Sequence, residues 1–338
     1  MKLFPFAVPR WLASAHLQTL GASLPFFAPP RSFRPAGDET LRIPLPRGGA
    51  LHAHAWWHDG PGPRPAVVVV HGVGGSSESR YVIRAAVALH RAGWHVLRLD
   101  LRGAGDSMGD VRELYHAGLT EDPRATLDYL AEDPRVSSVG LVGFSLGGHV
   151  LLRLAGEMGA EVPPALKAVV AISAPLDLSE VTRAIERRRS YPYHSYILRK
   201  LVSQGKAFAR LHPERAGYDV RALGKVRSIR AYDGLVVAPM HGFASAEDYY
   251  MRASAGPLVA RIKVPTLLAH AEDDPMVPAE SVRRSLAASN GAVEEAWTAR
   301  GGHVGWFGGM DEHSWVNTWA VTQAIGFLGR HFGERSTG

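Results

Sequence analysis

The sequence predicts an α/β fold with a mostly parallel, doubly wound sheet and a helical cap inserted between two strands. Short apolar runs alternate with amphipathic helical stretches through most of the chain, which is typical of right-handed βαβ units. This alternation stops between residues 177 and 262, where the chain is rich in Arg and Tyr and has no strongly apolar strand. We therefore expect a core of residues 1–176 and 263–338, with residues 1–40 packed on it as an extension. Residues 177–262 are expected to form a cap, either a lid or extra scaffold helices.

Composition limits the classes of protein that fit this sequence. The chain has 338 residues, and 46% of them are hydrophobic, so a disordered protein is excluded. No apolar run reaches the roughly 18 residues that a membrane-spanning helix needs. Cysteine is absent, which removes disulfides, thiolate metal sites and cysteine nucleophiles. We expect a globular, cytoplasmic protein, and the sequence indicates no oligomeric state.

The formal net charge is +6, yet the basic residues are mostly interleaved with acidic ones. We therefore expect no nucleic-acid partner. A local basic cluster lies in the expected cap, and its members are Arg183, Arg187, Arg188, Arg189, Arg199, Lys200, Lys206 and Arg210. Two interpretations of this cluster stay open, a solvated helical face or a peripheral contact with an anionic ligand or lipid surface.

The first residues resemble the start of a signal peptide, with Lys2 before the apolar stretch 3–8. Pro5, Pro9 and Arg10 interrupt this stretch before a long enough apolar segment forms. We therefore expect the segment to belong to the mature fold.

The core elements are expected in the following order. Gly48-Gly49 marks a turn between the first two strands, at 41–45 and 51–57. Residues 66–70 are apolar at every position, which suits a strand buried on both faces. Further strands are expected at 94–100, 139–143, 168–173, 265–271 and 293–298, and helices at 77–91, 121–132, 145–158 and 313–332.

One serine lies in a motif that is typical of catalytic nucleophiles. Residues 143–147 read G-F-S-L-G, with an expected strand directly before them and an expected helix directly after. Such a turn presents the serine hydroxyl at the carboxyl end of the sheet, and its glycines allow strand and helix to close up. We predict that Ser145 is a nucleophile rather than part of a glycine-rich structural turn.

A serine nucleophile needs a base and an orienting acid, which follow it in the chain order Ser, acid, His in this type of fold. Asp274 follows the expected strand at 265–271, and it is the favoured acid. Asp273 and Asp177 remain alternatives. The favoured base is His303, in the glycine-rich loop after the last strand, and His313 is its competitor.

Hydrolysis also needs N–H donors for the oxyanion of the tetrahedral intermediate. We predict the backbone N–H groups of Leu146 and Val73, since Val73 lies in a glycine-rich loop directly after the strand at 66–70. This loop has no dinucleotide or Walker spacing, so a phosphate-binding turn is disfavoured. In a second loop, Asp100 and Arg102 are expected to pair and to hold the chain beside the nucleophile.

Several of these blocks together resemble the α/β-hydrolase superfamily and, within it, the YheT-like hydrolases. The blocks are H-L-Q-T at 16–19, residues 71–79, 143–148 and 242–250, D-D-P at 273–275, and 301–305. They span most of the chain, in the family's order. The resemblance implies an α/β-hydrolase fold with a helical cap, the triad of Ser145, Asp274 and His303, and esterase or lipase-like activity on carboxylic esters.

We accordingly predict a serine hydrolase that cleaves short- to medium-chain or lipid-like esters through an acyl-enzyme. An acyltransferase with the same acyl-enzyme and a non-catalytic binding protein are the alternatives. His71, Phe144, Tyr249 and Tyr250 are expected to contact the substrate. No cofactor and no metal are expected, because the sequence has no dinucleotide fingerprint and no H-E-x-x-H motif. The block at 16–19 has no catalytic role that the residues explain.

Overall fold

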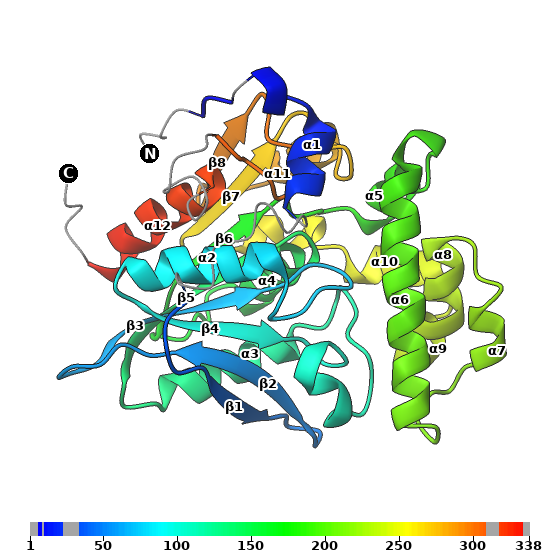
Figure 1. Ribbon diagram of the computed structural model, residues 1–338, viewed down its shortest axis with the longest axis horizontal. Helices are drawn as coiled ribbons and strands as arrows, with labels where there is room; N and C mark the ends of the chain where they lie inside the picture. Colours follow the sequence, from blue (N-terminus) through cyan, green and yellow to red (C-terminus); the bar gives the residue numbers. More distant parts are fainter. Residues whose placement is uncertain (1–5, 9, 23–33, 309–317, 334–338) are drawn as a thin grey trace.

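A computed structural model describes residues 6–8, 10–22, 34–308 and 318–333. These residues form one eight-stranded sheet in the order β1-β2-β4-β3-β5-β6-β7-β8 (Figure 1). The strand β2 runs antiparallel to β1 and β4, and the remaining neighbours are parallel. The strands are β1 Glu39–Pro44, β2 Ala50–Trp56, β3 Arg64–Val70, β4 His95–Asp100, β5 Val136–Phe144, β6 Leu166–Ile172, β7 Thr266–Ala271 and β8 Val293–Thr298.

Helices cover both faces of this sheet, as a doubly wound fold requires. Val67 and Val69 of β3 pack with α2 (Arg80–Arg91) and α12 (Trp319–Phe332) on one face. Val68 and Val70 pack with α3 (Glu121–Ala131) and α4 (Leu146–Met158) on the other face. This double burial explains why β3 is apolar at successive positions. The predicted α/β fold with a mostly parallel, doubly wound sheet is therefore confirmed.

Most predicted elements lie within two or three residues of the observed ones. The expected helix at 77–91 begins only at Arg80. The helix α11 (Ala279–Leu286), which we did not predict, lies between β7 and β8. The closing helix is described from Trp319 onward, and the predicted part at 313–317, with His313, lies outside the described residues.

Between β6 and β7 the described chain is helical, and it occupies the interval that we predict to be the cap. The long helix α6 stands across the end of the sheet (Figure 1). The segments are α5 Leu178–Ile185, η5 Arg188–Ser190, α6 Tyr191–Leu211, α7 Val220–Leu223, α8 Ile229–Tyr232, the π-helical turn η6 Asp233–Val237, α9 Ala238–His241, α10 Ala246–Ala253 and η7 Gly256–Arg261.

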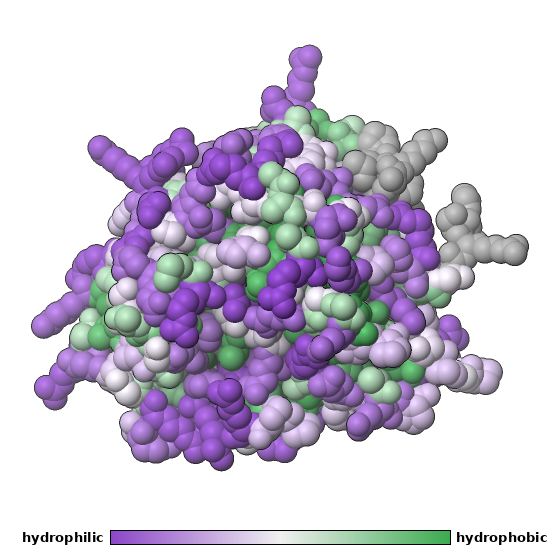
Figure 2. All heavy atoms as spheres, turned by 180° about the vertical axis from the view of Figure 1, so that it is seen from behind, coloured by the Kyte–Doolittle hydropathy of each residue, from purple (hydrophilic) through white to green (hydrophobic). Residues whose placement is uncertain are grey.

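The N-terminal part forms a short segment outside the sheet, with η1 (Arg10–Leu12) and α1 (Ala15–Gly21). Figure 1 shows α1 at the edge of the core that faces the cap. A further short helix, η4 (Gly105–Gly109), follows β4. Hydrophilic side chains cover most of the rear face, where hydrophobic groups are small and separate (Figure 2). In the described part of the chain, no helix combines the length and the apolar character needed to cross a bilayer.

Candidate active site

Ser145 occupies a sharp turn between β5 and α4. Its backbone has φ +51° and ψ −118°, a conformation that non-glycine residues rarely adopt and that stores strain. The turn also requires Gly147, because a Cβ atom there would lie 2.5 Å from the carbonyl oxygens of Val70 and His71. The Ser145 N–H donates to the Ile172 carbonyl over 2.8 Å, which holds the turn at the carboxyl ends of β5 and β6.

A buried acid–base pair lies beyond the end of β7. The Oδ2 atom of Asp274 is 2.7 Å from Nδ1 of His303, and both residues are buried. The Oδ1 atom accepts hydrogen bonds from the backbone N–H groups of Met276 and Val277, over 2.8 and 2.9 Å. Burial by itself raises the pKa of Asp274, but the His303 ring and the Val277 N–H outweigh it and hold this pKa below its usual value. Asp274 is therefore set to stay ionised.

The other predicted acids have different partners. Asp273 accepts a hydrogen bond from the Gly302 N–H over 2.9 Å, and so it holds the loop that carries His303. Asp177 caps α5 by accepting from the Glu180 N–H. Of the three candidates, Asp274 alone contacts the His303 ring.

Helix α1 also holds the loop that carries His303, through hydrogen bonds between its side chains and the loop backbone. Thr19 Oγ1 accepts from the His303 N–H over 2.8 Å and donates to the Ala15 carbonyl over 2.7 Å. The Gln18 side chain accepts from the Phe307 N–H and donates to the Phe307 carbonyl. A Cβ atom on Gly302 would lie 2.5 Å from the Ala15 carbonyl oxygen, so loop and helix touch closely. These contacts explain the H-L-Q-T block, to which sequence reasoning assigned no role.

The loop after β3 lies against Ser145. A Cβ atom on Gly72 would be 3.1 Å from that of Ser145. Two tyrosines fix the loop, since the Gly72 N–H donates to the hydroxyl of the partly buried Tyr81 and the Gly74 N–H donates to the hydroxyl of the buried Tyr115. Within the described residues, the N–H groups of Val73 and Leu146 have no hydrogen-bond acceptor. They are free to donate to a substrate oxygen.

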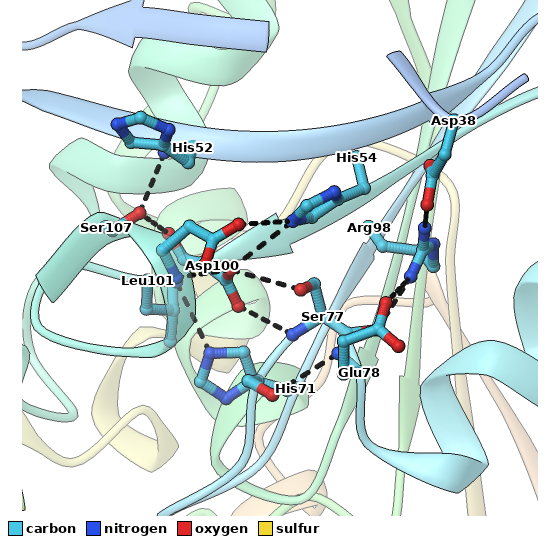
Figure 3. Close-up of polar contacts among 12 residues, drawn as sticks. Asp38, His52, His54, His71, Ser77, Glu78, Arg98, Asp100, Leu101 and Ser107 are labelled. Atoms are coloured by element: carbon cyan, nitrogen blue, oxygen red, sulfur yellow. Dashed lines mark hydrogen bonds and ion pairs between the residues drawn. The ribbon is translucent and has the colours of Figure 1, made fainter. Parts of the chain in front are cut away.

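Asp100 ties this loop to the one that follows β4 (Figure 3). Its buried carboxylate accepts from the Ser77 N–H over 2.6 Å, from the Ser77 hydroxyl and from the Asp106 N–H. The predicted pairing of Asp100 with Arg102 is wrong, because the Arg102 guanidinium binds the buried Asp122 instead, over 2.6 Å.

The same network holds a group of three side chains with metal-ligand chemistry. Ligand atoms of His54, Asp100 and Asp106 lie within 4.8 Å of one another. However, N–H and hydroxyl donors already occupy the Asp100 carboxylate. The arrangement is explained as a structural network, and it does not indicate a metal site.

Two cavities meet at Ser145, and both are lined by Val73, Ser145, Ile197 and Met276. One of them, which we name the Leu146 cavity, has a volume of about 100 Å³. It is lined further by Leu114 and by apolar side chains of the helices between β6 and β7, among them Leu178, Val181 and Ile229. The His303 cavity, of about 310 Å³, is lined further by Thr19, Leu20, Tyr81, Tyr193, Tyr196, Arg199 and His303. Ser145 and His303 thus face one space, although the described residues show no hydrogen bond between their side chains. In unliganded enzymes this contact is often long and tightens only with substrate.

The predicted substrate contacts divide into two pairs. Tyr249 and Tyr250 line the Leu146 cavity, where Tyr249 accepts from the Ala117 N–H and Tyr250 donates to Asp233. His71 and Phe144 line neither cavity. The His71 ring is buried between the Gly72 carbonyl and the Leu101 N–H, and the buried Phe144 ring packs against Tyr81.

Sequence reasoning missed several polar residues of the Leu146 cavity, and Asp233 is the acid among them. Asp233 is a buried carboxylic acid in the π-helical turn η6, and it lines the Leu146 cavity. Burial raises the pKa of Asp233 to about 7. The sequence signal that could have indicated a buried acid here is an aspartate shortly before the apolar run at 235–238.

Comparison with known proteins places this geometry in a family. The model of the family described as serine aminopeptidase, S33, matches residues 61–303. YheT from Escherichia coli (strain K12), which carries an esterase name, is 32% identical over 314 residues, or 91% of this chain and 88% of that protein. Monoacylglycerol lipase from Saccharomyces cerevisiae is 28% identical over 75% of this chain and 57% of its own length.

Solved structures agree in fold at lower identity. Pyrococcus furiosus esterase Pf2001 has a TM-score of 0.56 and 17% identity, covering 97% of this chain and 99% of that one. The 2,6-dihydroxy-pseudo-oxynicotine hydrolase has a TM-score of 0.59 at 17% identity, over 94% of this chain and 73% of its own. The fold, the family model and the identity to YheT lead to one conclusion: the chain belongs to the α/β-hydrolase superfamily and, within it, to the YheT-like esterases.

Proposed function

We propose that the protein hydrolyses carboxylic esters through an acyl-enzyme on Ser145. The observation that carries the proposal is the buried Asp274–His303 pair, in which His303 lines the same cavity as Ser145, a serine on a strained turn. His303 takes the hydroxyl proton as Ser145 attacks the acyl carbon, and it then gives that proton to the leaving alcohol. Asp274 orients the ring and stabilises the imidazolium. Water, activated in turn by His303, releases the acid and regenerates Ser145.

The oxyanion of each tetrahedral intermediate is held by the N–H groups of Val73 and Leu146. Both residues line the Leu146 cavity beside Ser145, and both N–H groups lack acceptors in the described part of the chain. Donors fixed in advance at this position are typically worth about 10²–10³ in rate each. Tyr81, Tyr115 and Asp100 support them through their hydrogen bonds to the loop.

The two cavities suggest how an ester is divided between them. The leaving alcohol must lie beside His303, because that ring supplies its proton, and His303 lines only one of the two cavities. We therefore assign the alcohol to the His303 cavity and the acyl chain to the Leu146 cavity. An apolar cavity of about 150 Å³ holds a benzene molecule. The Leu146 cavity, at about 100 Å³, accordingly suits acyl chains of a few carbon atoms.

The test is hydrolysis of p-nitrophenyl esters from acetyl to dodecanoyl by the wild type, Ser145→Ala and Ser137→Ala. Ser137 is an exposed serine near the start of β5 and serves as the matched control. We expect the highest kcat/KM at short chains, activity lost in Ser145→Ala, and activity retained in Ser137→Ala. A fluorophosphonate probe should label the wild type once and leave Ser145→Ala unlabelled.

Activity that survives in Ser145→Ala would overturn the mechanism. A transfer product that dominates over the free acid when an alcohol is added would instead assign the acyl-enzyme to an acyltransferase. Because relatives carry the names monoacylglycerol lipase and phospholipase, monoacylglycerols and phospholipids form a second substrate series.

A further inference from the structure

We propose that α1, together with η1 and the first turns of α6, forms a docking surface for an anionic lipid bilayer at the mouth of the His303 cavity. The first observation is an inverted pattern of polarity in α1. Its polar residues Gln18 and Thr19 are buried, whereas Leu17 and Leu20 are 47% and 48% exposed. A surface helix that meets only water has the opposite pattern.

Exposed apolar and aromatic side chains gather on the neighbouring elements. Trp11 of η1 is 57% exposed, and Tyr191 and Tyr196 of α6 are 65% and 46% exposed. A hydrogen bond of 2.6 Å between Nδ1 of His16 and the Tyr193 hydroxyl joins α1 to α6, and their rings stack. We call the five exposed side chains of these elements the apolar rim, and they are Trp11, Leu17, Leu20, Tyr191 and Tyr196. Trp and Tyr are the side chains that concentrate at bilayer–water interfaces.

Basic side chains border the apolar rim. Arg10 precedes Trp11, the run 187–189 precedes Tyr191, and Arg199 lines the His303 cavity. These arginines are exposed, and no carboxylate of the described residues pairs with them. Elsewhere many surface arginines are paired, as Arg284 is with Glu180. An apolar rim among unpaired cations fits an anionic lipid surface, for which apolar burial and charge attraction act together.

A second copy of the chain fits this face less well. A two-fold contact through the apolar rim would bring two sets of unpaired arginines together, which charge repulsion opposes. Docking on a lipid surface would also explain why the apolar rim lies at the mouth of the His303 cavity. Leu20 and Tyr196 belong to the rim and also line the His303 cavity, so docking would bring the mouth of that cavity to the bilayer. This use rests on the proposed function, whereas the docking itself does not.

The test is co-sedimentation of the full-length Ser145→Ala protein with vesicles, so that binding is measured without turnover. Vesicles of phosphatidylcholine alone are compared with vesicles containing about 30% phosphatidylglycerol, at about 50 mM and about 500 mM salt. Trp11→Ser combined with Leu17→Gln removes apolar character from the rim. Leu211→Gln combined with Val220→Gln is the matched control, since these residues are 51% and 40% exposed. Leu211 lies about 30 Å from Tyr191 along α6.

We expect binding to the anionic vesicles that weakens at high salt. The rim variant should bind at least about tenfold more weakly, which corresponds to only about 1.4 kcal/mol, and the control variant should bind like its parent. Thermal melting of both variants shows that loss of binding is not loss of folding. The proposal is overturned if the parent binds no vesicles, or if the control variant loses as much binding as the rim variant. A concentration-dependent dimer that the rim variant abolishes would overturn it too, and would assign the face to a second copy.

Discussion

Two adjacent carboxylates hold the candidate base in different ways. Asp274 contacts the His303 ring, whereas Asp273 accepts from the backbone of Gly302. We predict that Asp274→Asn lowers kcat by about 10⁴, because the amide no longer stabilises the imidazolium and favours the wrong tautomer. Asp273→Asn keeps an oxygen for the Gly302 N–H, and its kcat should stay within about tenfold of the wild type. Steady-state kinetics on a short-chain ester separate the two.

The pair of variants distinguishes between the two acids that the sequence left open. Equal losses in both would show that the loop position, and not the ring contact, limits the rate. A larger loss in Asp273→Asn than in Asp274→Asn would contradict the assignment.

Asp233 should make folding stability depend on pH. Its folded pKa of about 7 lies above the unfolded value of about 3.9, so the folded state binds more protons between these values. The stability that this proton uptake contributes is present at low pH and is lost as pH rises through 7. We predict that the unfolding free energy of the wild type, relative to Asp233→Asn, falls by about 2–3 kcal/mol from pH 5 to pH 8. Urea denaturation of both proteins at pH 5 and pH 8 measures these free energies. If the free energy of the wild type relative to Asp233→Asn rises or stays constant between the two pH values, the prediction is refuted.

Among the elements, α1 contacts the candidate base through the backbone of His303. Thr19→Val removes the acceptor of the His303 N–H and leaves that group unpaired in a buried place. We predict a fall in kcat of roughly tenfold to a hundredfold, with Thr19→Ser close to the wild type, because Ser keeps the hydroxyl. Steady-state kinetics give kcat and KM separately. A Thr19→Val variant that changes KM alone would assign Thr19 to substrate contact.

Elements with strong local signals could be predicted from the sequence. The strand β3 is apolar because both of its faces are buried, and the turn at Ser145 needs glycine at positions that the sequence shows directly. The pairing of Asp274 with His303 also followed from chain order, because the fold brings the ends of β7 and β8 together. For these features, local patterns and topology were sufficient.

Contacts between residues that are far apart in the sequence could not be predicted from local patterns. The Thr19–His303 hydrogen bond joins residues 284 positions apart, and no local pattern marks either end. Arg102 has the carboxylate of Asp100 close by in sequence but binds Asp122, because α3 brings that acid into the core. The helix expected from Ser77 begins only after its N-cap residue Ser79, because Ser77 hydrogen-bonds to Asp100 instead. In each case the tertiary contact decides among local options.

In the whole molecule, the proposed acyl site lies between the predicted core and the predicted cap. Leu114 and Leu146 belong to the predicted core, and Val181 and Ile229 belong to the helices between β6 and β7. Neither part alone encloses the cavity. If this proposal is right, the chain-length preference depends on how the helices between β6 and β7 pack over the carboxyl ends of the strands. A substitution in these helices should then change the preference without altering Ser145, Asp274 or His303.

Val181→Phe tests this directly, because Val181 lines the Leu146 cavity from α5 and is none of the three residues to which we assign the chemistry. The larger ring should fill part of a cavity of about 100 Å³, so we predict that kcat/KM for hexanoyl esters falls at least about tenfold more than for acetyl esters. Val202→Phe is the matched control on α6, outside both cavities. It should leave the ratio of the two rates unchanged. Overpacking costs about 1–3 kcal/mol in stability, so both variants are compared well below their melting temperatures. If Val181→Phe slows both esters equally, the acyl chain lies elsewhere, and the division of the ester between the two cavities must be reversed.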